Sequence, residues 1–227
     1  MTELLHAAIV LAVLCIFSIV SYKKKLLDFE GILVANIVGL AIFLLGDITK
    51  FLVTVFFFIA AEASTVIARK NTKTKHEVRT TGNILGNSGA AVLSLIFNFP
   101  FGFFAALSAA LADTLSSEIG LLSKRKPVLI TTLEKVPHGT DGGVTPLGMY
   151  AALAGAAAIA SIHFYLEQNL LLFLVLIASG FIGSTVDSFF GAVFERKKML
   201  NNAEVNFLGS CGGVAAGLLL IRLAAIL

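Results

Sequence analysis

Hydrophobic residues in this chain occur in long runs that short polar and charged segments separate. A helix that spans a bilayer needs about 20 apolar residues, and about 17 can suffice. The pattern predicts eight such helices, over residues 4–20, 30–46, 51–68, 82–97, 101–122, 146–164, 169–194 and 205–226. We therefore expect an all-α polytopic membrane protein with one integral membrane domain over residues 1–227.

The composition supports this interpretation. The chain is 57% hydrophobic and 14% charged, with a mean hydropathy of +0.93, whereas soluble domains carry roughly 25% charged residues. Long apolar runs favour spanning helices over the alternating strands of a membrane β-barrel. Cys15 and Cys211 lie far apart in apolar runs and form no metal-binding pattern, so we expect both to be packing residues. The net charge of +3 is too small to indicate nucleic-acid binding.

Basic residues are concentrated in alternate connections between the predicted helices. Of the 17 lysines and arginines, 15 follow the first, third, fifth and seventh helices, and only Lys50 and Arg222 do not. Loops rich in lysine and arginine face the cytoplasm in most membrane proteins. We therefore expect a cell-membrane protein with the basic loops in the cytoplasm and both termini outside.

The chain also contains an internal echo. Residues 83–90 at the start of the fourth helix resemble residues 206–213 at the start of the eighth. Ser-Thr-Val ends the third helix at residues 64–66 and recurs in the seventh at 184–186. The echo predicts that helices three and four are repeated as helices seven and eight, in parallel orientation. The alternative is that helix seams rich in small residues look alike.

Several acidic residues lie inside predicted spanning helices, where a charge is expensive and usually functional. Asp113 and Glu118 lie in the fifth helix, and Asp187 lies in the seventh. Each falls in the cytoplasmic half, so we expect them to converge at that surface. Asp113 and Glu118 are about 140° apart on an ideal helix, so one ligand could reach both only in a wide cleft or an unwound helix. The alternative for Asp113 and Asp187 is hydrogen bonding between helices, and for Glu62 it is pairing with a nearby cation.

A glycine-rich loop follows the fifth helix and carries Lys135, His138 and Asp141. Glycines in such a loop let backbone amides approach an anion closely. Thr145-Pro146 is a typical helix start, and a helix N-terminus favours phosphate. The loop is neither a Walker A sequence nor a dinucleotide-binding fingerprint, and it predicts a phosphate site mainly because charged residues accompany the glycines.

Carboxylates are the predicted metal ligands. Asp113, Glu118, Asp141 and Asp187 offer hard oxygen atoms, and the chain has no clustered histidine or cysteine. This ligand set favours Mg²⁺ shared with substrate phosphates over zinc.

Three motifs resemble one known family. Ala112–Gly120, Val136–Gly148 and Val186–Gly191 are similar to motifs of the integral-membrane phytyl-phosphate kinases of plants and plastids and their archaeal, bacterial and animal relatives, long classed as a domain of unknown function. Arg79–Gly89 and Glu204–Phe207 also match, so the resemblance covers residue 80 to nearly the C-terminus. A more distant similarity links the chain to dolichol kinases and CDP-lipid synthases.

The resemblance implies transfer of the terminal phosphate of a nucleoside triphosphate, with CTP expected, to a prenyl monophosphate such as phytyl or geranylgeranyl phosphate. It places the site in residues 62–145 and 180–210, with Mg²⁺ as cofactor and membrane lipids as surroundings. The implied catalytic residues are Asp113, Glu118, Asp187 and Lys135. The implied phosphate-binding residues are Arg79, Asn83, Asn87, Lys135, His138, Gly139, Thr140, Gly142, Gly143 and Asn206.

Other functions remain open at the level of the sequence. A cytidylyltransferase that makes a CDP-activated lipid would use similar residues but release pyrophosphate. An ion-coupled secondary transporter could use the intramembrane acids as an ion pathway, although transporters commonly have inverted repeats and sites at the membrane midplane. A purely structural membrane protein would leave the acidic residues unexplained.

Overall fold

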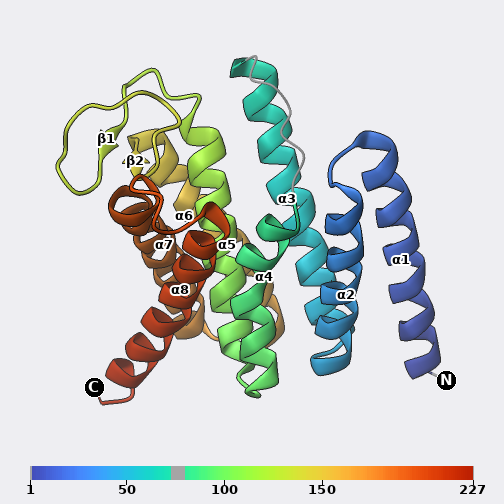
Figure 1. Ribbon diagram of the computed structural model, residues 1–227. Helices are drawn as coiled ribbons and strands as arrows, with labels where there is room; N and C mark the ends of the chain where they lie inside the picture. Colours follow the sequence, from blue (N-terminus) through green and yellow to red (C-terminus); the bar gives the residue numbers. More distant parts are fainter. Residues whose placement is uncertain (1, 73–79, 227) are drawn as a thin grey trace.

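The computed structural model describes residues 2–72 and 80–226, and this part of the chain is mainly helical (Figure 1). Its α-helices are α1 (Thr2–Lys24), α2 (Phe29–Leu45), α3 (Ile48–Thr72), α4 (Thr81–Ile96), α5 (Pro100–Gly120), α6 (Pro146–Glu167), α7 (Leu170–Phe190) and α8 (Asn202–Ala224). A short π-helix, η1 (Gly191–Glu195), directly follows α7. The predicted all-α class is confirmed, with element boundaries close to those expected.

Not every helix has the length and composition of a membrane span. Among the described residues, α1, α3, α6, α8 and the continuous helix formed by α7 and η1 are long and apolar enough to cross a bilayer. Helix α2 is apolar but has only 17 residues. Helices α4 and α5 fall outside this set, so the structure supports a polytopic membrane protein but not eight clear spans.

Helix α5 lies at the centre of the bundle, which explains its weaker apolar character. Thirteen of its 21 residues are buried, and helices α3, α4, α6, α7 and α8 all pack against it. Small residues allow this close packing: a Cβ atom on Gly155 would lie 2.8 Å from the carbonyl oxygen of Leu111. Because protein rather than lipid surrounds α5, the helix can carry serine, threonine and carboxylate side chains.

Helices α1 and α2 form the periphery of the molecule. Helix α1 buries only Val10 and Ser21 and packs mainly against α2. One polar contact joins the two, because the amide of Asn36 donates a hydrogen bond of 2.9 Å to the Ser18 hydroxyl. Most of the α1 surface is thus left to face lipid.

The predicted repeat of two hairpins is not matched in the packing. Helices α7 and α8 form an extensively packed hairpin, whereas α3 packs mainly against α5 and the described parts of α3 and α4 make few contacts. The two similar segments instead pack against each other, since α4 contacts α8 and a Cβ atom on Gly89 would lie 3.0 Å from the Phe207 ring. These segments therefore share one seam of small residues, and the packing gives no further support to a repeated hairpin.

The connection between α5 and α6 contains a small antiparallel sheet that the sequence did not predict. Strand β1 (Val128–Leu129) pairs with β2 (Gly143–Val144), and Val128 also forms a bridge with Lys135. Figure 1 shows this loop at one end of the bundle, beside the last turns of α3 and α5, with both chain termini at the opposite end. The predicted turn at residues 98–102 joins α4 to α5 at that opposite end, where Asn98 has a φ of 51°.

Candidate active site

A cavity of about 420 Å³ lies at the loop end of the bundle. It is bounded by the C-terminal ends of α3, α5 and α7, the N-terminal ends of α4, α6 and α8, and the loop before α6. The structure brings most of the predicted site residues to its wall: Asn83, Asn87, Asp113, Glu118, His138, Gly139, Thr140, Asp141, Gly142, Gly143, Asp187 and Asn206. The expected convergence at one end of the helices is therefore present.

Asp113 and Asp187 form a close pair of carboxyl groups in the cavity. Asp113 on α5 accepts a long hydrogen bond of 3.5 Å from Ser184 on α7, and its carboxyl group lies close enough to Asp187 to interact directly. The Oδ2 atom of Asp187 is buried and has no hydrogen-bond partner among the described residues. Two adjacent carboxylates repel each other unless a proton or a cation lies between them. The pair is thus suited to hold a cation.

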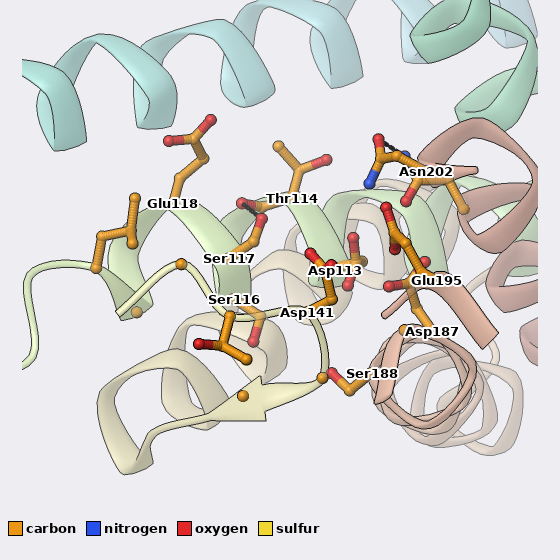
Figure 2. A pocket seen from close by; sticks show the side chains of 18 of the residues that line it. Asp113, Thr114, Ser116, Ser117, Glu118, Asp141, Asp187, Ser188, Glu195 and Asn202 are labelled. Carbon is orange, nitrogen blue, oxygen red and sulfur yellow. Dashed lines mark hydrogen bonds between the residues drawn. The ribbon is translucent and has the colours of Figure 1, made fainter. Parts of the chain in front are cut away.

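Two further carboxyl groups complete this part of the cavity. Asp141 comes from the loop and Glu195 from η1, and both are near enough for their charges to act on Asp187. Figure 2 shows Asp113, Asp141, Asp187 and Glu195 gathered together, and we call this group the acid end of the cavity. Glu195 was not predicted from the sequence, because it lies in a charged segment and a π-helix changes which face its residues present.

A set of asparagine amides supports the acid end. The backbone N–H of Thr80 donates to Asn83 Oδ1 at 3.0 Å, and the Nδ2 atoms of Asn83 and Asn206 both lie 3.4 Å from Asn202 Oδ1. Asn202 also lies close enough to Glu195 to act on its carboxyl group. The network connects α4, α8 and η1, so Asn83 and Asn206 have a positioning role in addition to facing the cavity. Asn202 was also missed from the sequence.

Glu118 lies apart from the acid end. Its Oε1 atom accepts a hydrogen bond of 2.8 Å from the Thr65 hydroxyl on α3, and Figure 2 shows the side chain directed toward that helix. Arg69, four residues after Thr65, also lines the cavity. We call Thr65, Arg69 and Glu118 the α3 end. The cavity is wide enough to contain both faces of α5, as the predicted angle between Asp113 and Glu118 requires.

The glycines of the loop differ in their surroundings. Gly139 and Gly142 have φ angles of 79° and 74°, a conformation that favours glycine. A Cβ atom on Gly142 would lie 2.4 Å from the Cβ of Ala192 and 2.6 Å from the carbonyl oxygen of Ser188, whereas one on Gly139 would meet nothing within 4 Å. The loop therefore packs closely against the junction of α7 and η1 at Gly142, whereas it has free space around Gly139.

The loop amides are only partly available to a ligand. The N–H of Thr140 donates to the Pro137 carbonyl oxygen at 3.3 Å, and that of Gly143 donates to the Thr140 carbonyl oxygen at 2.9 Å. The start of α6 is as predicted: the Thr145 hydroxyl accepts a hydrogen bond of 3.0 Å from the Gly148 N–H, with Pro146 at the first helical position. This cap places the loop against the N-terminus of α6.

Two predicted residues are not part of the described cavity wall. Lys135 is exposed and does not line the cavity, because its backbone bridges Val128 in the small sheet. Arg79 lies outside the described residues. Lining residues that the sequence did not indicate are Arg69, Thr80, Thr114, Ser116, Ser117, Ser188, Glu195 and Asn202. The hydroxyl and amide groups among them are too common in helix seams to stand out in a sequence.

The four predicted metal ligands do not form one group. Asp113, Asp141 and Asp187 lie at the acid end, whereas Glu118 is held at the α3 end. Within residues 2–72 and 80–226, no three histidine, cysteine, aspartate or glutamate side chains are arranged to hold a metal ion by themselves. A cation at the Asp113–Asp187 pair would need further ligands from a substrate or water.

Comparisons with known proteins agree with this architecture. Residues 12–214 match the model of the family described as integral membrane protein DUF92. The chain is 34% identical to the membrane protein MJ0933 of Methanocaldococcus jannaschii, over 97% of this chain and 96% of that protein. It is 28% identical to two Arabidopsis thaliana proteins: Protein PGR, over 77% of this chain and 74% of PGR, and the chloroplastic Protein VTE6, over 78% of this chain and 62% of VTE6. No solved structure matches. The extent of the family match shows that this chain belongs to the DUF92 family of integral membrane proteins.

Proposed function

We propose that the protein is a membrane kinase that transfers the terminal phosphate of a nucleoside triphosphate, with CTP as first candidate, to a prenyl monophosphate. The observation that carries the proposal is the Asp113–Asp187 pair, which faces a glycine-containing loop in a polar cavity at one end of an otherwise apolar bundle. The similarity of its motifs to phytyl-phosphate kinases and the relationship to the chloroplastic Protein VTE6 support the proposal.

The reaction needs little acid–base chemistry. An oxygen of the prenyl phosphate attacks the γ-phosphorus, the bond from that phosphorus to the β–γ bridging oxygen breaks, and the nucleoside diphosphate leaves with the electron pair. The products are a prenyl diphosphate and a nucleoside diphosphate, and a fully ionised acceptor requires no proton removal. Catalysis of this kind depends on aligning two polyanions and compensating their charge. The cavity residues serve these two tasks.

The acid end fits a Mg²⁺ ion. Its donors are hard carboxylate oxygens, and the buried Oδ2 atom of Asp187 has no hydrogen-bond partner in the described part of the chain. Magnesium is commonly held by one or two carboxylates together with phosphates and water. Asp113 and Asp187 would hold the ion, with Asp141 beside them, and Glu118 would not take part. When bound, the ion would neutralise phosphate charge.

We place the cavity on the cytoplasmic side. The basic residues at the ends of α1 and α3, after α5 and after η1 lie at the cavity end of the bundle, including Lys24, Arg69, Lys126 and Lys197. Cytoplasmic loops carry such an excess of basic residues. A single cysteine at Lys126 should react only with reagent supplied from the cytoplasmic side, and labelling from outside would contradict this orientation.

A direct assay tests the function. The purified protein should be incubated with Mg²⁺ and terminally labelled CTP, ATP or GTP, together with dimethylallyl or geranylgeranyl monophosphate. A labelled prenyl diphosphate and an unlabelled nucleoside diphosphate are the expected products. Release of pyrophosphate with incorporation of the nucleotide into lipid would instead identify a cytidylyltransferase. Neither product with any acceptor would contradict both enzyme hypotheses.

A further inference from the structure

The two ends of the cavity differ in charge. Among the described residues, five carboxyl groups line the cavity, and four of them form the acid end. Among the described residues on its wall, Arg69 is the one lysine or arginine. The described part of the wall therefore offers two phosphate-bearing substrates one strong cation, and its position bears on which substrate lies at which end.

The position of Arg69 follows from its neighbours on α3. Residues four apart lie on the same helix face, so Arg69 stands one turn beyond Thr65, toward the end of α3. Because Thr65 contacts Glu118 directly, the Arg69 side chain belongs to the same side of the cavity. Glu118 lies five residues after Asp113, or about 7.5 Å further along the axis of α5. Figure 2 shows Glu118 directed away from the acidic group around Asp187.

We propose that Arg69 binds the phosphate of the lipid acceptor, so that the α3 end is the acceptor subsite and the acid end takes the nucleotide. This inference rests on the proposed kinase function. A nucleoside triphosphate is bound together with Mg²⁺, which suits carboxylates. A monophosphate acceptor brings no metal of its own and needs a cation from the protein. Guanidinium matches phosphate with two parallel hydrogen bonds.

The surroundings of α3 favour the same assignment. Val66 and Ile67, directly before the Arg69 turn, are 51% and 49% exposed, which in a membrane protein presents them to lipid. A prenyl chain can therefore stay against the apolar surface of α3 while its phosphate reaches Arg69. The acid end is instead enclosed by the loop, η1 and the start of α8. A substrate anchored in the bilayer reaches the α3 end first.

Kinetics with both substrates varied test this inference. Arg69→Gln should raise KM for geranylgeranyl monophosphate about tenfold or more, because a charge-assisted phosphate contact is lost, and should leave KM for Mg²⁺–CTP within about twofold. Arg69→Lys keeps the charge but loses the paired hydrogen bonds, so an intermediate rise is expected. Lys70→Gln is the matched control: Lys70 is exposed, adjacent on α3 and absent from the cavity wall, so both KM values should stay unchanged.

The outcomes separate this inference from the function on which it rests. If the wild-type protein transfers no phosphate to any acceptor, the kinase proposal itself fails. If the wild type is active but Arg69→Gln changes neither KM, or raises both equally, the acceptor subsite is wrong while the kinase function stands. Should Arg69→Gln not fold, Arg69→Lys alone decides, because an unchanged acceptor KM in that variant overturns the assignment.

Discussion

Helices α5 and α1 are both mostly apolar, yet their surroundings are opposite. Helix α1 is a clear membrane span that buries only Val10 and Ser21, so lipid contacts most of its surface. Helix α5 has thirteen buried residues, falls outside the set of clear spans and carries Asp113 and Glu118. The helix that lipid contacts most is thus a clear apolar span, whereas the central helix, which carries two of the cavity's carboxyl groups, is not.

The contrast extends to the loop before α6. Gly142 contacts the junction of α7 and η1, and the charge of Asp141 acts on Asp187. A Cβ atom on Gly139 would meet nothing within 4 Å, and Lys135 is exposed and away from the cavity wall. Contact with the central helices, rather than residue type alone, thus separates the groups that we expect to affect activity from those that we do not. Four predictions test this distinction.

The largest effect is expected at the acid end. Asp113→Asn and Asp187→Asn should each lower turnover by at least about 10²- to 10³-fold, since they remove charge that holds a cation beside the phosphates. Both variants should insert and purify normally, because the side-chain shape is kept. Asp47→Asn, at the opposite end of the bundle, should leave turnover unchanged. Near-normal turnover in both acid-end variants would favour simple hydrogen bonding between helices.

Two helical glycines, one packed against α5 and one at the α1–α2 contact, test whether the centre of the bundle tolerates less added volume than the periphery. A Cβ atom on Gly180 would lie 2.3 Å from the Ser108 Oγ atom and 3.0 Å from the Ser108 carbonyl oxygen on α5. On Gly39, at the α1–α2 contact, it would lie 3.0 Å from a Leu14 side-chain carbon. Overpacking costs about 1–3 kcal/mol, so Gly180→Ala should lower the thermal midpoint in detergent by about 5 °C or more. Gly39→Ala should lower it by less than about 2 °C, and equal losses would remove the distinction between centre and periphery.

The two loop glycines provide a smaller but more specific test. Gly142→Ala should weaken Mg²⁺–CTP binding by about tenfold, because the added carbon displaces the loop from the α7–η1 junction. Gly139→Ala carries a similar penalty for its positive φ but meets no neighbour, so its affinity should stay within about threefold of the wild type. Titrating Mg²⁺–CTP into each variant measures the two affinities. Similar losses would show that backbone strain, and not seating of the loop, is the cause.

The smallest effect is expected at Lys135. Because this side chain is exposed and does not line the cavity, Lys135→Ala should change Mg²⁺–CTP affinity by less than about twofold. A tenfold loss of affinity would instead support the prediction from the sequence that Lys135 contacts a phosphate. The same titration measures it, with Lys124→Ala as a second exposed lysine of the same connection.

Much of the architecture could be predicted because apolar runs, caps and turns are local properties. The cap at Thr145, the turn at residues 98–102 and the convergence of Asp113 and Asp187 all follow from local sequence or from helix direction. A carboxylate in an apolar helix is conspicuous because burying it is costly.

The errors have equally physical causes. Glu195 is in a charged segment, so it looks ordinary until a π-helix directs it into the cavity. Arg69 was explained by membrane orientation alone, although it also lines the site. Lys135 was misplaced because a bridge between distant backbone segments has no local signal. Similar small-residue segments predicted a repeated hairpin, and in the structure they lie at one shared seam between α4 and α8.

The shortness of α2 and α4 has a consequence for the bilayer itself. These helices have 17 and 16 residues, so they extend about 26 and 24 Å, against about 30 Å for a typical hydrocarbon core. They pack against each other, and α4 begins at the cavity. A membrane adapts to short helices by thinning beside them. The lipid headgroups next to this pair would then sink by several ångströms toward the cavity mouth, and a phosphate carried by the membrane would meet the protein without leaving its own layer.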